Sequence, residues 1–323
     1  MNDKKKHNFV SVNLLDIRLD EPLPVSVHLF VDGRFLLLRA EGDSIPQEVF
    51  DRLVYKHVQF VFVDEAVKPK LLAWISKAEN LERKAILESP DTIRSLLESK
   101  HEAKRRMLDL FSKSKLDEAG KEALSVSKEL TGKLMGRSYA VESLSYLQSF
   151  SRGAVDHSVN VSMLAIYLAL RMGFDNPVVL ENLGAGALLH DIGKFQVWME
   201  ATQNSETLDE PEEILKQHSI LGAQFLMAEG EVPREVITLI AQHHEYYDGS
   251  GYPQGMKGNE IFELAKILTI ANEFDAAVFR QDRLLDIKDR QRNALKWMLS
   301  EKERKKYDPI QLEKVERILS AGI

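Results

Sequence analysis

The sequence predicts an α+β protein: a small N-terminal α/β domain (residues 1–66), a helical linker (67–114) and an all-helical C-terminal domain (115–323). Three observations support this prediction. β-branched and aromatic residues gather in short runs early in the chain, and apolar residues recur at three- and four-residue steps in its middle. Every later segment between Gly, Pro and Asn has helical character. With 323 residues the chain is long enough for two separate cores.

The N-terminal part contains three strand candidates and one helix candidate. The stretch PVSVHLFVDGRFLLLRA gives two strands joined by Asp32 and Gly33, a pair typical of tight hairpins. A helix candidate, SIPQEVFDRLVYK, follows with Ser44 as its expected N-cap, and HVQFVFVD gives the third strand. Since no chemical motif is present here, we expect a sensory or interaction module.

The linker has the pattern of a charged, solvent-exposed helix. From Pro69 to Ser112, apolar positions such as Ile86 and Ile93 recur at helical spacing among many charged residues. Such a segment is usually a connector or a dimerising coil. It is therefore our candidate for a homodimer contact.

The C-terminal part consists of helix candidates. The predicted helices cover residues 121–136, 158–173, 177–190, 212–229, 233–244, 261–279 and 289–301. No strand signal of comparable strength occurs among them, so the sequence predicts a domain without a sheet.

Composition excludes several classes of protein. The net charge of −7 argues against binding of duplex nucleic acid, which usually needs a basic face, but a small anionic ligand needs only a local basic pocket. The absence of cysteine excludes disulfides and thiolate metal sites. No run approaches the roughly 20 apolar residues of a membrane span, and no apolar run of signal-peptide length follows the N-terminus. We expect a cytoplasmic protein.

The histidines point to a metal centre. Five of the nine lie between residues 157 and 244. His190 and Asp191 end a helix candidate that is otherwise Leu, Ala and Gly, and such a helix buries a polar pair only if something satisfies it. Imidazole and carboxylate together suit iron, manganese or zinc. Taken singly, each histidine is more simply a core or surface residue, but the set favours a metal site.

Two pairs of adjacent residues suggest more than one ion. Neighbouring side chains on a helix diverge by about 100°, so the pairs His190–Asp191 and His243–His244 fit helix ends or two different ions. A carboxylate can bridge two ions roughly 3.5–4 Å apart, an arrangement common in the hydrolysis of phosphate esters.

Five motifs, taken in order, resemble the HD-GYP family, a branch of the HD phosphohydrolase superfamily. They are DHSVNV from Asp156, LLHDIGK at 188–194, QHS at 217–219, HHEYYDGSGYP at 243–253 and ANEFDAA at 271–277. The resemblance covers about residues 140–320 and leaves the first 110 residues outside it.

The resemblance implies a helical HD-type domain that hydrolyses cyclic di-GMP, or a related cyclic dinucleotide, through a two-metal-activated hydroxide. The positions that match metal ligands are His157, His190, Asp191, His218, His243, His244 and Asn272. Asp191 and Lys194 are the implied catalytic residues, with Lys194 near the substrate phosphate. The loop DGSGYP would form a wall of the site through Tyr252 and is also a candidate surface for a protein partner.

Three departures from the family pattern bear on activity. Asn272 stands where the family has a ligating Asp, and on a helix we expect the nearby Glu273 and Asp275 to point elsewhere. Gly153 stands where members with a third ion carry Glu, so two ions are expected, with iron or manganese as leading candidates. Arg280 and Arg283 only loosely match a substrate-binding stretch.

Two hypotheses follow. The leading one is a metal-dependent phosphodiesterase that hydrolyses cyclic di-GMP. The alternative is an HD-GYP domain, weakened by Asn272, that acts as a cyclic dinucleotide receptor or a protein-interaction module.

Overall fold

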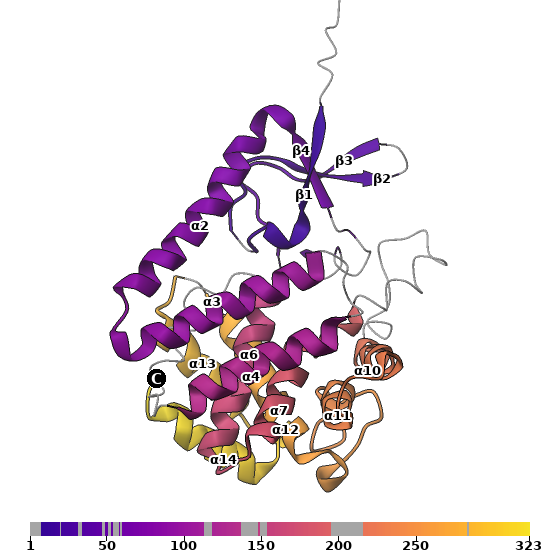
Figure 1. Cartoon of the computed structure of the whole chain (residues 1–323), viewed down its shortest axis with the longest axis vertical. Coiled ribbons are helices and arrows are strands. Elements are labelled where there is room, and N and C mark those ends of the chain that lie inside the picture. The colour runs from indigo at the N-terminus through magenta and orange to yellow at the C-terminus, as the bar shows by residue number, and fades with distance from the viewer. Residues whose placement is uncertain are drawn as a thin grey trace, which may run out of the picture. The chain divides into compact units, whose positions relative to one another are not determined.

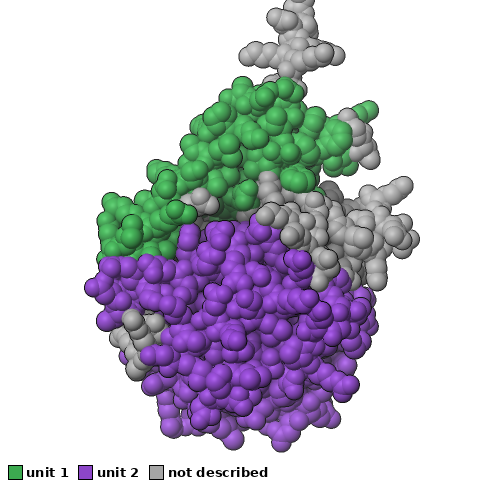
Figure 2. All heavy atoms as spheres, in the orientation of Figure 1, with its two compact units in different colours: residues 1–88, 198–208 green, residues 89–197, 209–323 purple. Residues whose placement is uncertain are grey.

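The computed structural model of the chain describes residues 8–19, 21–31, 34–46, 49–50, 53, 58, 60–112, 118–136, 148, 154–194, 216–282 and 284–323. The chain divides into two compact units (Figure 2). The first contains the described residues up to Glu88, and the second contains those from Ser89 onward. The boundaries predicted at residues 66 and 114 remain predictions.

The first unit contains a four-stranded antiparallel sheet in the order β1-β4-β2-β3 (Figure 1). The strands are β1 (Phe9–Asn13), β2 (Val27–Val31), β3 (Arg34–Arg39) and β4 (Phe60–Asp64). One face buries Val12, Val27, Val61 and Val63, as the two-residue alternation of a half-buried strand requires. β1 was not among the three predicted strands. The predicted Asp32–Gly33 turn and most of the helix after Ser44 lie outside the described residues.

Two long helices fill the stretch in which the sequence predicts a helical linker. They are α2 (Lys68–Glu88), in the first unit, and α3 (Asp91–Ser112), in the second. On α3, Arg106 forms ion pairs of 2.6 Å with Glu122 and with Glu129 of α4. Lys104 forms another, 3.0 Å long, with Asp156 of α6. This face of α3 therefore belongs to the helical unit.

Every regular element among the described residues of the second unit is a helix (Figure 1). Its further helices are α4 (Ala119–Met135), α6 (Ala154–Arg171), α7 (Pro177–Leu189), α10 (His218–Glu229), α11 (Arg234–Gln242), α12 (Glu263–Phe279), α13 (Ile287–Met298) and α14 (Pro309–Ser320). α7 packs against α4, α6 and α11, and α6 packs against α12. Helices in contact on several sides must be apolar around most of their circumference, and α6, α7 and α12 are.

Local signals fix where these helices begin and end. Asn176 caps α7 by accepting a 3.0 Å hydrogen bond from the Val178 backbone N–H, and Pro177 occupies the first turn. Gly230 ends α10 with a left-handed φ of 75°. Of the helix predicted over residues 212–229, residues 212–215 lie outside the described residues, Lys216 and Gln217 form a turn, and α10 begins at His218.

The fold class is confirmed: a small sheet near the N-terminus precedes a helical unit. Within the described part of the chain, no helix combines the length and the apolar character needed to cross a membrane.

Candidate metal centre

Helix ends bring the predicted ligands together. His157 lies in the first turn of α6 and His190 caps the end of α7. His218 opens α10, and His243 caps the end of α11. Asp191, His244 and Asn272 complete the set, the last from the middle of α12. Because ends and caps project their side chains in several directions, adjacent residues such as His243 and His244 can face one site.

A glycine contact sets the approach of α10. A Cβ on Gly193, in the HDIGK motif, would overlap the His218 carbonyl oxygen and come within 2.5 Å of the Gly222 backbone nitrogen. Gly193 thus lets the backbone after Asp191 touch the first turn of α10. The motif glycine therefore has a packing role: it brings His218 to the shared carboxylate.

The ligand atoms form two groups that share one carboxylate. Asp191, His218, His243 and His244 form what we call the His218 group, and His157, His190 and Asp191 form the His157 group. Within each group the potential ligand atoms lie within 4.8 Å of one another. In either group, as far as the described residues go, Asp191 is the only carboxylate.

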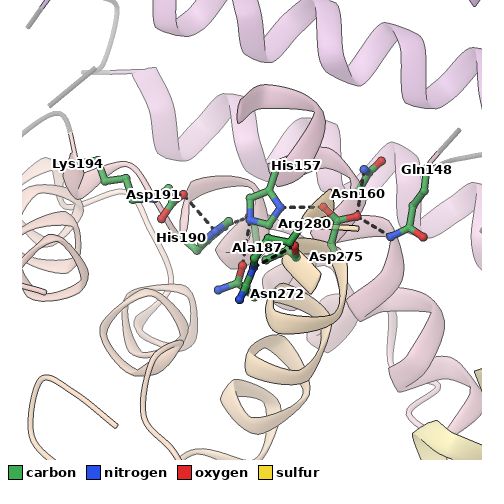
Figure 3. Close-up of polar contacts among 11 residues, drawn as sticks. Gln148, His157, Asn160, Ala187, His190, Asp191, Lys194, Asn272, Asp275 and Arg280 are labelled. Atoms are coloured by element: carbon green, nitrogen blue, oxygen red, sulfur yellow. Dashed lines mark hydrogen bonds and ion pairs between the residues drawn. The ribbon is translucent and has the colours of Figure 1, made fainter. Parts of the chain in front are cut away.

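The Asp191 carboxylate faces both groups. Its Oδ2 lies 3.5 Å from His190 Nε2 (Figure 3). Its Oδ1 lies 3.4 Å from His218 Nε2. Oδ1 is buried, and no described residue donates a hydrogen bond to it. A buried carboxylate oxygen without a donor is costly unless a cation satisfies it. This arrangement fits a carboxylate that bridges two ions.

The remaining separations also fit metal ligands. Two ligand atoms bound at roughly 2.1 Å and at right angles lie about 3.0 Å apart. His218 Nε2 and His243 Nε2 are 3.2 Å apart, and His157 Nε2 lies 2.9 Å from Asn272 Oδ1. Thus Asn272, although neutral, places its oxygen where a ligand of the His157 group would stand. The residues present fit a metal centre.

The second ring nitrogen of three imidazoles has an acceptor. His190 Nδ1 donates to the Ala187 carbonyl at 2.8 Å, and His243 Nδ1 donates to the Ile240 carbonyl at 2.7 Å. His157 Nδ1 lies 2.8 Å from Asp275 Oδ2. An Nδ1–H that donates to these acceptors leaves the Nε2 lone pair directed into the site, as metal ligation requires.

Burial and charge set the ligand protonation states. Burial lowers the pKa of His190 to about 4, and burial with neighbouring histidines lowers the pKa of His243 and His244 well below the ordinary value. Burial by itself would raise the pKa of Asp191, but the positive charge of surrounding groups such as His190 and Lys194 holds it well below the usual range. At neutral pH these groups are in the forms that bind cations.

Asp275 is a functional candidate that the sequence reasoning placed wrongly. We expected its side chain to point away from the site, but it reaches His157 from behind (Figure 3). Burial lowers the pKa of His157, and the hydrogen bond and charge of Asp275 outweigh burial, so the pKa is raised. The spacing offered a signal, because Asn272 and Asp275, three residues apart, share a helix face.

The glycine-rich loop is held from inside by Glu245. This residue is 2% exposed and accepts backbone hydrogen bonds from Gln254 at 2.7 Å and from Met256 at 2.9 Å. A Cβ on Gly251 would overlap the backbone of His244 and Tyr246, so the turn requires glycine there. The sequence reasoning did not single out Glu245.

The loop places Tyr252 against a ligand of the His218 group. The Tyr252 ring stacks on His244 with centroids 4.6 Å apart and planes at 25°. The Tyr252 backbone N–H donates to the His244 carbonyl at 3.0 Å. The loop thus forms a wall beside this group.

The residues predicted to contact substrate are less closely grouped than the candidate metal ligands. Lys194 Nζ lies 2.7 Å from Asp191 Oδ2, directly beside the shared carboxylate. Arg280 is 61% exposed and lies 3.6 Å from Glu273, a carboxylate that also accepts a hydrogen bond from Tyr246. Arg283 and Gly153 lie outside the described residues.

Comparison with known proteins identifies the family. The family model for the HD domain matches residues 133–310. Cyclic di-GMP phosphodiesterase PA4108 from Pseudomonas aeruginosa is 30% identical over 177 residues, 54% of this chain and 42% of the relative. A cyclic di-GMP phosphodiesterase from Thermotoga maritima is 36% identical over 127 residues, 39% of this chain and 34% of the relative. The 3'3'-cGAMP-specific phosphodiesterase 3 from Vibrio cholerae is 37% identical over 95 residues, 29% of this chain and 20% of the relative.

These matches span less than half the length of each relative. Among solved structures, Bd1817, an HDG"Y"P protein from Bdellovibrio bacteriovorus, is similar in fold, with a TM-score of 0.56 at 21% identity over 97% of this chain and 100% of that one. The five motifs had predicted an HD-type domain, and the chain belongs to the HD domain family.

Proposed function

We propose that this protein is a metal-dependent phosphodiesterase that hydrolyses cyclic di-GMP. The observation that carries the proposal is the pair of ligand groups joined by Asp191. The relatives named cyclic di-GMP phosphodiesterases support the choice of substrate, and the family is a metal-dependent one.

Two divalent ions held by these groups would supply a water of lowered pKa as the nucleophile and would neutralise charge on the phosphate. Imidazole and carboxylate ligands suit iron or manganese. Five neutral imidazoles and one carboxylate leave the pair of ions strongly cationic, which favours an anionic phosphodiester.

Lys194 is the proposed phosphate contact. Its ammonium group lies beside Asp191 at the edge of the centre, with a quarter of the side chain exposed. A phosphate oxygen that approaches the shared carboxylate would therefore meet this charge, which lowers the cost of bringing two anions together. In the His218 group, the ring of Tyr252 beside His244 offers a flat apolar surface suited to a nucleobase or ribose. We assign Arg280 and Arg283 as outer contacts for the second phosphate.

The test is direct hydrolysis by the full chain. Protein purified without oxygen and loaded with Mn²⁺ or Fe²⁺ is incubated with cyclic di-GMP, and linear dinucleotide and GMP are separated by chromatography. A parallel incubation with 3'3'-cGAMP tests the alternative cyclic dinucleotide. Asp191→Asn serves as the inactive control. Absence of product from protein that contains two ions would contradict the proposed activity.

Asn272 favours a second candidate, a receptor that binds the dinucleotide without turnover. The neutral amide removes one negative charge from the His157 group, and hard cations prefer charged oxygen ligands. Binding of cyclic di-GMP without product, measured by calorimetry on the same metal-loaded protein, would support this alternative. The loop around Tyr252 as a partner surface and the linker as a dimer contact also remain proposals.

A further inference from the structure

We propose that a relay of buried amides, running from Gln291 through Gln148 to Asp275, fixes the orientation and tautomer of His157. Asp275 is then a positioning residue of the centre, and Gln291 acts on His157 from a distance. The inference rests on the proposed metal function. It concerns this chain's own hydrogen bonds and not the reaction.

The relay joins three helices through short contacts. Gln291 Nε2 of α13 donates to Gln148 Oε1 at 2.7 Å, and Gln148 Nε2 donates to Asp275 Oδ1 of α12 at 2.6 Å. Asp275 Oδ2 lies 2.8 Å from His157 Nδ1 of α6, and Figure 3 shows the line from Gln148 to His157. Gln291, Gln148 and Asp275 are 0%, 8% and 3% exposed, so water does not substitute for these contacts.

Each member fixes the direction of the next. Because Gln291 offers an N–H to the oxygen of the Gln148 amide, the Gln148 nitrogen must point the other way, toward Asp275. Asp275 Oδ1 then accepts from Gln148 and, at 3.2 Å, from Asn160 Nδ2. Its Oδ2 is left to accept from His157 Nδ1–H.

The consequence falls on the Nε2 atom of His157. With the proton held on Nδ1, Nε2 carries the lone pair, and it faces Asn272 Oδ1 at 2.9 Å. A carboxylate behind a ligating imidazole also raises its basicity. Asn272 supplies no negative charge to the His157 group. Asp275 supplies it indirectly, through its hydrogen bond to His157.

The amide of Asp275→Asn cannot satisfy this arrangement. If its NH₂ faces His157, the imidazole must accept at Nδ1 and carry its proton on Nε2, which blocks ligation. If its oxygen faces His157, its NH₂ meets the donor groups of Gln148 and Asn160. Gln148 cannot turn over to relieve this clash while Gln291 donates to its oxygen.

A second substitution should release the conflict. In Gln291→Glu the carboxylate can accept from a Gln148 amide that has turned over. The Gln148 oxygen then accepts from the amide introduced by Asp275→Asn, whose own oxygen accepts from His157. The double variant has the same net charge as the wild type and reverses the amides of the relay. Alone, Gln291→Glu should have a small effect, because a protonated carboxyl group can still donate to Gln148.

The experiment is a titration of the metal-free full chain with Mn²⁺ alone, followed by calorimetry. It compares the wild type, Asp275→Asn, Gln291→Glu, the double variant, and Asp275→Asn with Gln291→Leu as the control that cannot accept a hydrogen bond. We expect Asp275→Asn to weaken one of the two Mn²⁺ sites by at least roughly tenfold, the same site that His157→Ala abolishes. Gln291→Glu in that background should restore the affinity to within about threefold of the wild type. Gln291→Leu should restore it less, because it frees Gln148 to turn over but leaves the buried Gln148 NH₂ without an acceptor.

Circular dichroism and the thermal midpoint establish that each variant is folded. A folded double variant no better than Asp275→Asn would overturn the relay. So would an Asp275→Asn protein with unchanged Mn²⁺ affinity. Hydrolysis is not the readout: a wild type that binds two Mn²⁺ but yields no product contradicts the proposed activity, while the titration still decides the relay.

Discussion

The two halves of the centre share Asp191 but are built differently. The His218 group has three histidines from α10 and the end of α11, and a loop pinned by Glu245 covers it. The His157 group has two histidines and, in place of a second carboxylate, the Asn272 oxygen. Asp275 contacts the Nδ1 atom of His157, on the side of the ring away from the ligand atom Nε2. Ligand charge and ligand positioning can thus be supplied by different residues, and we predict one tightly bound and one weakly bound ion.

The largest effect should come from removing what the halves share. Asp191→Asn replaces the carboxylate that the two groups share with a neutral amide, so both ions should be lost and hydrolysis should fall to background. Elemental analysis of the purified protein measures this loss. Asp175→Asn, an exposed position between α6 and α7, is the matched control and should keep both ions. Retention of one tight ion in Asp191→Asn would mean that the carboxylate does not bridge.

Separate substitutions in each half should show the asymmetry. His157→Ala should remove only the weaker ion, because the four residues of the His218 group remain. His243→Ala should remove the tighter ion and leave the site formed by His157, His190, Asp191 and the neutral amide of Asn272. Mn²⁺ titration of the two variants gives the residual affinities. Equal residual affinities would contradict the inequality of the halves.

The candidate ligands could be named from the sequence because their motifs are local. His190 with Asp191, and His243 with His244, are neighbours in the chain, and helix ends turn them to one site. The supports are harder to predict, since Gln148 and Gln291 are 143 positions apart and reach Asp275 only through packing of α12 and α13. Strand β1 is also tertiary in origin, because only pairing with β4 distinguishes it from an apolar loop.

The third effect concerns the loop of the His218 group. In Glu245→Gln the side-chain NH₂ would face a backbone N–H of Gln254 or Met256, which leaves a buried donor unpaired. The expected loss is about 1–3 kcal/mol in the free energy of unfolding, with weaker Mn²⁺ binding confined to the tighter site. Denaturant unfolding and Mn²⁺ titration measure the two quantities. Glu260→Gln, in an exposed short turn nearby, is the comparison. Weaker Mn²⁺ binding at the His157 group instead would show that the loop does not act on the His218 group alone.

The stability of the metal-free protein should depend on pH through the histidines of both groups. The pKa of His190 is lowered by burial to about 4 from 6.5, so the unfolded chain binds more protons below pH 6.5 and stability falls as pH falls toward 4. His243 and His244 act in the same direction, and His157, whose pKa is raised, acts in the opposite one. From His190 alone we expect a loss of about 2 kcal/mol between pH 6.5 and pH 5. Unfolding of chelator-treated protein over this range measures the loss, and His190→Gln should flatten it.

The smallest effect is the most informative about the origin of the asymmetry. Asn272→Asp adds a carboxylate oxygen beside His157 Nε2, where the neutral oxygen now lies at 2.9 Å. Hard divalent ions favour charged oxygen, so the weaker Mn²⁺ should bind about tenfold more tightly, while the tighter one should change little. An enzyme adapted to the amide should gain little activity from the change, and a receptor without other substrate contacts should gain metal but no turnover. Titration and hydrolysis measured side by side separate these cases. Unchanged affinity at both sites would show that position 272 is not a ligand, and the weakness of the His157 group would then have to come from its two histidines.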